Sequence, residues 1–216
     1  MSTLASDRPA SLRASAPARA AGLRLTAATW AAAGFVLVYV VAVRTPAGQQ
    51  LDEAAMHWTA AAVTGDDWAE ALLSAVSAGS VLLVGIALAA ATALARGLRP
   101  AALGVLSATA VLVGAQVLKL TLTRPEWSVQ AMANSFPSGH VAAVTGLAVS
   151  LLLAVPPGRW RHVALAAVAP VVALTGLATV VLEWHRPSDV IGSVLLAAAV
   201  GLAAAQYESR RRRRRA

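Results

Sequence analysis

Five long stretches of the chain contain no Lys, Arg, Asp or Glu and consist mainly of apolar residues. They cover residues 25–43, 71–95, 101–118, 163–182 and 190–207. A helix needs about 20 apolar residues to cross the hydrocarbon core of a bilayer. Each stretch is therefore expected to form one transmembrane helix.

A sixth uncharged stretch covers residues 127–158, but its strongly apolar part begins only after His140 and ends near Val155. A helix this short must recruit residues 137–140 at one end or lie in thinner lipid. With this span included, the pattern predicts an all-α polytopic membrane protein with six transmembrane helices.

Composition narrows the class of protein further. Hydrophobic residues make up 58% of the chain and charged residues 13%, whereas a soluble domain has about 25% charged residues. This excludes an ordinary globular protein and a disordered one. The chain has no cysteine, which excludes disulfides, thiolate chemistry and zinc–thiolate sites.

The basic residues divide unevenly between alternate connecting segments. One set, which includes both tails, holds 14 Lys and Arg residues, and the other set holds 4. Because positively charged loops stay in the cytoplasm, we expect both termini to be cytoplasmic. The segments around 119–140 and 183–189 are then expected to face outward, at the cell membrane.

Three regions follow from these patterns. Residues 1–24 are rich in Arg, Ala, Ser and Pro and are expected to form a disordered cytoplasmic tail. Residues 25–207 form the membrane domain, and 208–216 form an Arg-rich tail. A basic run beside a membrane span favours contact with anionic lipid headgroups rather than with nucleic acid. Oligomeric state is left open.

The first outward loop contains Trp58, Trp68 and His57 within residues 49–70. This combination is compatible with an amphipathic helix on the membrane surface. His57 is interpreted as structural.

The sequence Pro137-Ser138-Gly139-His140 opens the fourth span. Ser138 can cap the helix, and Gly139 lets a ligand approach the backbone. The free N–H groups of a helix N-terminus suit a phosphate, with His140 above it as a proton donor. The simpler interpretation is a helix start with an interfacial histidine.

His185 and Asp189 are separated by one helical turn if a helix begins near Pro187, a residue that suits the first turn. The carboxylate would then hold one ring nitrogen of His185 and leave the other free for nucleophilic attack. A helix cap beside an interfacial histidine is the simpler alternative.

Lys119 is the only lysine among 18 basic residues, and Arg124 follows five positions later. Two cations near a helix N-terminus are typical of a phosphate clamp. A lysine at the end of a span also commonly extends to the interface for structural reasons.

Together these motifs resemble the type 2 phosphatidic acid phosphatase superfamily, membrane lipid phosphatases related to vanadium haloperoxidases. The resemblance implies that His185 is the nucleophile that forms a phosphohistidine, that Asp189 orients it, and that His140 is the general acid. It implies phosphate binding by Lys119, Arg124, Ser138 and Gly139, and catalysis without a metal or other cofactor.

Two departures from the family pattern stand out. Only four residues separate Lys119 from Arg124-Pro125, fewer than the family usually has. The family's third block also carries an arginine where this chain has Thr179, a role for which Arg186 is a possible substitute.

The sequence therefore predicts a phosphatase acting on a lipid phosphate or diphosphate at the outer face. Polyprenyl phosphate, polyprenyl diphosphate and phosphatidic acid all fit. One alternative is a lipid-phosphate binder or transporter without catalysis, and another is an enzyme that passes the phosphoryl group to an alcohol.

Overall fold

The computed structural model describes residues 10–125, 127 and 134–214, and every regular element within them is helical. In chain order the elements are α1 (Ala10–Val38), the π-helical turn η1 (Tyr39–Val43), α2 (Pro46–Ala62), α3 (Asp67–Ala75), α4 (Ala78–Arg96), α5 (Leu98–Thr121), α6 (Gly139–Ala154), α7 (Arg159–Val181) and α8 (Pro187–Arg213).

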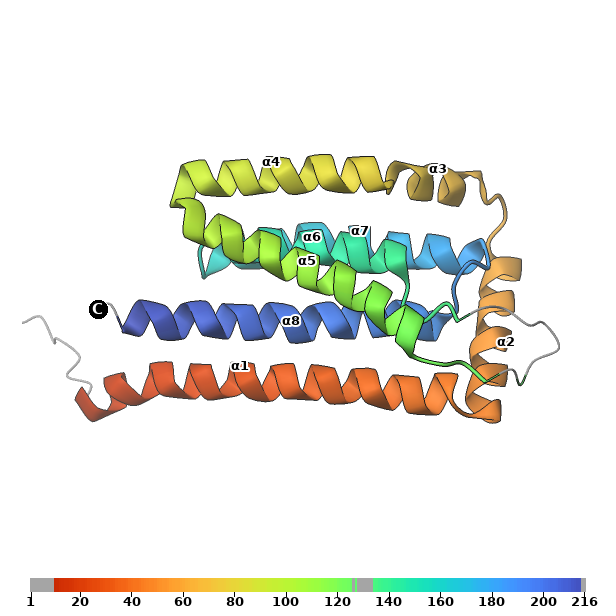
Figure 1. The fold of residues 1–216 in the computed structure, drawn as a ribbon, viewed down its shortest axis with the longest axis horizontal. Helices are drawn as coiled ribbons and strands as arrows, with labels where there is room; N and C mark the ends of the chain where they lie inside the picture. The colour runs from red at the N-terminus through yellow and green to blue at the C-terminus, as the bar shows by residue number, and fades with distance from the viewer. Residues whose placement is uncertain (1–9, 126, 128–133, 215–216) are drawn as a thin grey trace, which may run out of the picture.

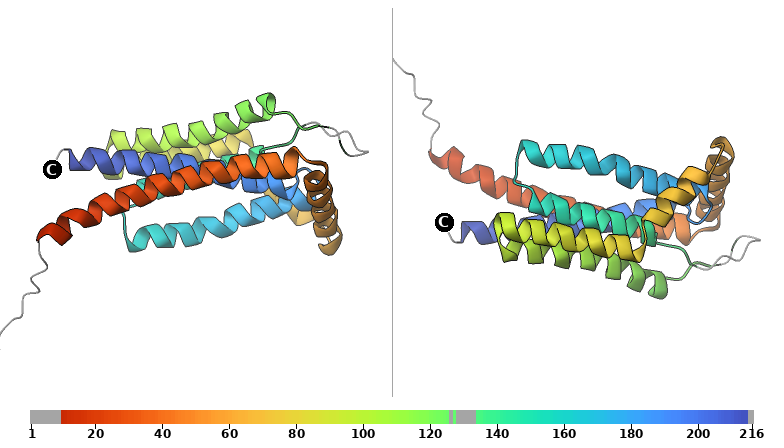
Figure 2. Two further views of the ribbon diagram at one scale, coloured as in Figure 1. Left: turned by 90° about the horizontal axis from the view of Figure 1, so that it is seen from below. Right: turned by 90° about the horizontal axis from the view of Figure 1, so that it is seen from above.

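The long helices run alongside one another as a bundle. α1 packs along α8 and α5 packs along α6, while α8 also contacts α6 and α7. α1 begins and α8 ends at the same end of the bundle (Figure 1). At the opposite end α2 lies across the bundle rather than along it (Figure 2).

The all-helical membrane fold is confirmed, and the six predicted spans correspond to five long apolar helices and one shorter one. Five helices in the described part of the chain are long and apolar enough to cross a membrane, and α6 is a shorter apolar helix. Large apolar side chains on the outer faces are exposed, such as Leu94 at 90% and Leu120 at 85%. This outward apolar surface is what a helix bundle presents to lipid.

The span predicted at 71–95 is wrong as a single helix, because the structure breaks it between α3 and α4. The hydroxyl of Ser77 accepts from the Ser80 N–H, and the Ser80 hydroxyl accepts from the Ser77 N–H. This reciprocal cap starts a new helix. α3 turns away and packs on α7.

The ends of α1 and α8 also differ from the region boundaries predicted from the sequence. α1 is already helical from Ala10, so it extends into the segment expected as a disordered tail, while residues 1–9 lie outside the described residues. α8 continues as a helix through the basic tail to Arg213. The helix expected in the first loop is present as α2.

Phe136 fixes the segment that leads into α6. Its side chain is fully buried, with its ring centroid 5.1 Å from that of Phe35 and 5.7 Å from that of Tyr39. A Cβ added at Gly192 would lie only 2.4 Å from Cε2 of Phe136. Glycine in α8 therefore makes room for the ring, and the start of α6 is held against α1 and α8.

Candidate active site

His185 and Asp189 meet where the chain passes from α7 into α8. Pro187 occupies the first turn of α8, as expected. Nδ1 of His185 lies 3.2 Å from Oδ2 of Asp189, and both residues are buried. A carboxylate on Nδ1 fixes the ring tautomer and leaves Nε2 without a proton, able to attack an electrophile.

The Asp189 carboxylate is held by several other donors. Oδ2 accepts from the Ser135 hydroxyl at 2.5 Å and from the Arg186 N–H at 3.1 Å, and Oδ1 accepts from Nη2 of Arg124 at 2.8 Å. Because these donors favour the charged form of a carboxylate, Asp189 is suited to stabilising a cationic His185.

Arg124 therefore contacts the carboxylate that is bonded to His185, and it lies in a buried position. Its side chain is only 4% exposed and is paired with Asp189. Its Nε and Nη1 atoms are buried and have no hydrogen-bond partner among the described residues. The geometry gives the predicted phosphate clamp a different contact, the carboxylate that orients His185.

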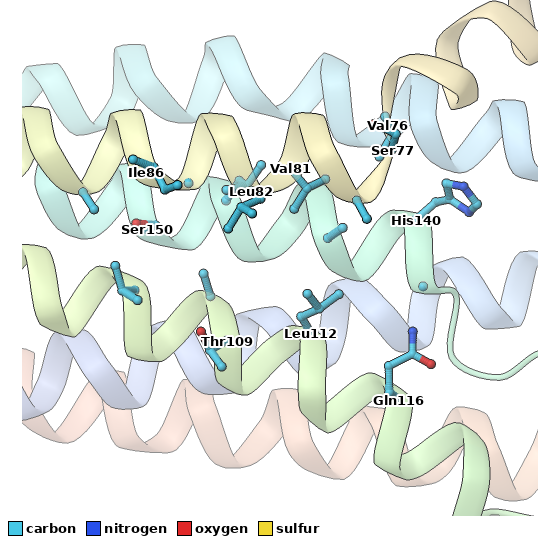
Figure 3. A pocket seen from close by; sticks show the side chains of 18 of the residues that line it. Val76, Ser77, Val81, Leu82, Ile86, Thr109, Leu112, Gln116, His140 and Ser150 are labelled. Atoms are coloured by element: carbon cyan, nitrogen blue, oxygen red, sulfur yellow. The ribbon is translucent and has the colours of Figure 1, made fainter.

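A cavity of about 730 Å³ opens between α4, α5 and α6. Most of its wall is apolar, with Val81, Leu82 and Ile86 on α4 and Leu112 on α5 (Figure 3). At one end the lining becomes polar, with Gln116, Lys119, Gly139, His140 and His185. Four of the residues predicted for the site thus share one end of one cavity.

Ser138 directly precedes Gly139 at this polar end but does not itself line the cavity. It is fully buried, and its hydroxyl accepts from the Val141 N–H at 3.5 Å as the N-cap of α6. The Ser138 N–H donates to the backbone carbonyl of Asp189 at 3.1 Å. Ser138 thus ties the start of α6 to the first turn of α8, which brings His140 and His185 to one cavity.

Gln116 is a candidate that the sequence analysis missed. It lies one helical turn before Lys119 on α5, and its amide points toward the first turn of α6 (Figure 3). A Cβ added at Gly139 would lie 3.3 Å from Nε2 of Gln116. An amide on an apolar span, close to the only lysine, was the available signal.

The helix α2 holds the loop that carries His185. Oδ1 of Asp52 accepts from the Ser188 N–H at 2.9 Å, and Oδ2 accepts from the Ser188 hydroxyl. Burial raises the pKa of Asp52, and the two bonds from Ser188 oppose that rise. The two partners are 136 residues apart in the chain, so no local sequence pattern indicates this anchor.

Two further pairs join α2 to the same loop. Nδ1 of His57 lies 2.6 Å from Oε1 of Glu183, with both side chains about half exposed. Nη2 of Arg186 lies 3.8 Å from Oε1 of Glu53. Arg186 is thus directed toward α2 and does not line the cavity.

Thr179, at the position where the family carries an arginine, is fully buried. Its hydroxyl donates to the Gly176 carbonyl at 2.7 Å. Its own carbonyl accepts from the N–H groups of Trp184 and His185. Thr179 therefore shapes the turn before His185 without adding a cation to the cavity.

Among the described residues, no group of three or more His, Asp or Glu side chains is arranged to hold a metal ion. The groups that line the polar end of the cavity are the imidazoles of His140 and His185, the ammonium group of Lys119 and the amide of Gln116.

Comparison with known proteins gives one family and one solved structure. The sequence model of the PAP2 superfamily matches residues 101–213, just over half of the chain. The fold is similar to the crystal structure of the first transmembrane PAP2 type phosphatidylglycerolphosphate phosphatase from Bacillus subtilis. That likeness has a TM-score of 0.71 and 19% sequence identity, and covers 85% of this chain and 96% of the other. Comparison with curated protein sequences gave no match.

Proposed function

The chain belongs to the PAP2 superfamily, and on this premise we propose that it hydrolyses a lipid phosphate or diphosphate through a phosphohistidine on His185. The resemblance inferred from the motifs is confirmed by the family match and by a fold shared with a membrane PAP2-type phosphatase.

The observation that carries the proposal is the polar end of the cavity. There the His185–Asp189 pair lies beside Lys119 and His140. Phosphoryl transfer depends mainly on positioning and on stabilisation of negative charge. The oriented imidazole supplies the nucleophile and the second imidazole supplies the acid. The ammonium group supplies the positive charge that stabilises the phosphate.

The reaction proceeds in two steps. Nε2 of His185 attacks phosphorus, a P–N bond forms and the P–O bond to the lipid breaks, while His140 protonates the departing oxygen. His140 then takes a proton from water, the resulting oxygen attacks the phosphohistidine, and the P–N bond breaks. Inorganic phosphate leaves and both imidazoles return to their starting state.

The apolar length of the cavity suits the hydrocarbon part of such a substrate. Its lining between α4, α5 and α6 is continuous with the polar end that holds His140 and His185. A lipid tail buried there keeps the phosphate near Lys119 and the first turn of α6. Polyprenyl and acyl lipids are both compatible with this shape.

We place the site on the outer face because 14 of the 18 basic residues fall in segments of the other side. By the same rule the Arg-rich end of α8 is cytoplasmic, where anionic headgroups are its expected contacts.

A second candidate function is binding of lipid phosphates without catalysis. The observation that favours it is Thr179, whose buried side chain leaves the cavity without the arginine that the family places there.

One experiment separates the two functions. Purified wild type is incubated with polyprenyl diphosphate, polyprenyl phosphate and phosphatidic acid, and released phosphate is measured beside His185→Ala and the control His162→Ala. We expect wild type and the control to release phosphate and His185→Ala to release none. Binding of these lipids without release by wild type would support the non-catalytic function, and release by His185→Ala would refute the nucleophile.

A further inference from the structure

A second cavity lies at the end of the bundle away from His185, and it is strongly basic. Its volume is about 770 Å³. One wall is the turn from α4 into α5 and the other is the last part of α8. The charged residues that line it are Arg96, Arg99, Arg211, Arg212 and Glu208. Four positive charges and one negative charge therefore face one space, which we name the basic cavity.

The arginines of the basic cavity differ in their contacts. Arg96 donates from Nη1 to the carbonyls of Leu153 and Ala154 at the end of α6. Arg212 is paired with Glu208. Neither Arg99 nor Arg211 has a hydrogen-bond or ion-pair partner within the part of the chain that the structure describes.

A further arginine, which does not line the basic cavity, adds to the positive charge at this end of the bundle. Arg161, at the start of α7, donates from Nη2 to the Val155 carbonyl at 3.3 Å, and its charged neighbours are Arg24, Arg96, Arg212 and the oppositely charged Glu208. Its Nε is buried without a partner among the described residues. Glu208 offsets only one of the four positive charges that line the basic cavity, so a bound anion would reduce the repulsion among the others.

The conformation of the α4–α5 turn brings arginines from two segments of the chain to one cavity. Gly97 has φ +91, a conformation that L side chains rarely adopt, and it reverses the chain directly between α4 and α5. Arg96 and Arg99 are thereby brought to the same side as the last turns of α8. The cavity is thus built from two separate segments of the chain.

The rest of the lining favours one kind of anion. Leu98, Leu103 and Tyr207 form apolar parts of the wall, and Leu98 is 79% exposed on the outer surface of the bundle. A free phosphate makes no use of such a surface, whereas a phospholipid places its phosphate among the arginines and its chains along the leucines. Basic pockets between transmembrane helices on the cytoplasmic side suit anionic phospholipid headgroups.

We propose that the basic cavity is a discrete binding site for an anionic phospholipid, separate from the site of hydrolysis. Arg99 and Arg211 hold the lipid phosphate by charge-assisted hydrogen bonds, and Arg96 and Arg212 strengthen the local field. The lipid joins the α4–α5 turn to α8. This site is independent of the phosphatase activity and does not require it.

The test compares two matched double variants of the full chain. Arg99→Gln with Arg211→Gln removes two charges from the basic cavity. Arg159→Gln with Arg210→Gln removes two charges from the same end of the bundle, at residues that do not line the cavity. Binding of phosphatidylglycerol to detergent-solubilised protein is measured by titration, with phosphatidylcholine and inorganic phosphate as further probes.

We expect the cavity variant to bind phosphatidylglycerol about tenfold more weakly than wild type, and the control variant to bind it within about twofold of wild type. Equal weakening in both variants would overturn the proposal, because it would show diffuse surface attraction. Inorganic phosphate binding as tightly as phosphatidylglycerol would overturn the assignment to a lipid. Equal thermal unfolding midpoints of the two variants in phosphatidylcholine check that both are folded.

Discussion

Arg124 donates from Nη2 to Oδ1 of Asp189 over 2.8 Å, with the two side chains 4% and 0% exposed. The sequence motif alone suggests that this arginine binds phosphate. In the structure its contact is the carboxylate that orients His185. This contact divides the site residues into those that orient the nucleophile and those that line the substrate cavity. Substitutions in the first group are expected to change kcat, and substitutions in the second to change KM.

Arg124→Lys tests the orienting role. Lysine keeps the charge but loses the planar guanidinium, so Asp189 and His185 lose their fixed geometry. We expect kcat to fall about tenfold or more with KM changed far less. Steady-state kinetics measure both, and Arg159→Lys is the control, since Arg159 begins α7 at the opposite end of the bundle. A raised KM with unchanged kcat would return Arg124 to the role of phosphate ligand.

Gln116→Leu tests the residue that faces the first turn of α6. Leucine keeps the approximate volume and removes the amide, so a lipid phosphate in the cavity loses one neutral hydrogen bond. We expect KM to rise about two- to tenfold, and Lys119→Ala to raise KM further because a charged contact is lost. Gln50→Leu, on the exposed face of α2, is the matched control. An unchanged KM in Gln116→Leu would remove this residue from the site.

Asp52→Asn tests the anchor between α2 and the His185 loop through pH. Burial raises the pKa of Asp52 above the ordinary 3.8, so the folded state favours the protonated carboxyl. Its contribution to stability is therefore greatest below the ordinary pKa and is lost as pH rises through the folded pKa. Asparagine does not titrate, so the Asp52→Asn variant should lack this dependence of stability on pH.

The measurement is the thermal unfolding midpoint between about pH 4 and pH 7. We expect the wild-type midpoint to rise relative to that of Asp52→Asn as the pH is lowered. Asp67→Asn, an exposed change at the start of α3, should run parallel to wild type. If the midpoint of Asp52→Asn also ran parallel to that of wild type, the role of Asp52 as a buried anchor would be contradicted.

His57→Gln removes a half-exposed pair with Glu183. Contacts between exposed polar side chains contribute about 0–1 kcal/mol to stability, and neither residue lines the cavity, so phosphatase activity should stay within about twofold of wild type. Initial rates on the best substrate measure this. A loss comparable to that of His185→Ala would show that His57 belongs to the chemistry.

Features that depend on local sequence were predictable. Charge-free stretches indicated the spans, Ser138 indicated the cap of α6, and the spacing of His185 and Asp189 around Pro187 indicated their contact. Each depends on residues within one or two helical turns. Helix geometry alone relates them.

Features that depend on distant segments were not predictable. The bond between Asp52 and Ser188 joins positions 136 residues apart, and that between Arg124 and Asp189 joins positions 65 apart. The break at Ser77 was missed because serine caps and apolar spans overlap in one uncharged stretch. Tertiary packing decides these contacts.

The most direct measurement of the central claim is capture of the phosphoenzyme. Wild type is mixed with a lipid substrate labelled on phosphorus, quenched within milliseconds and digested, and the labelled peptide is identified. We predict phosphate bound to His185, stable to base and labile to acid, and absent from His185→Ala. Turnover with no labelled protein, or label on a residue other than His185, would contradict the proposed mechanism.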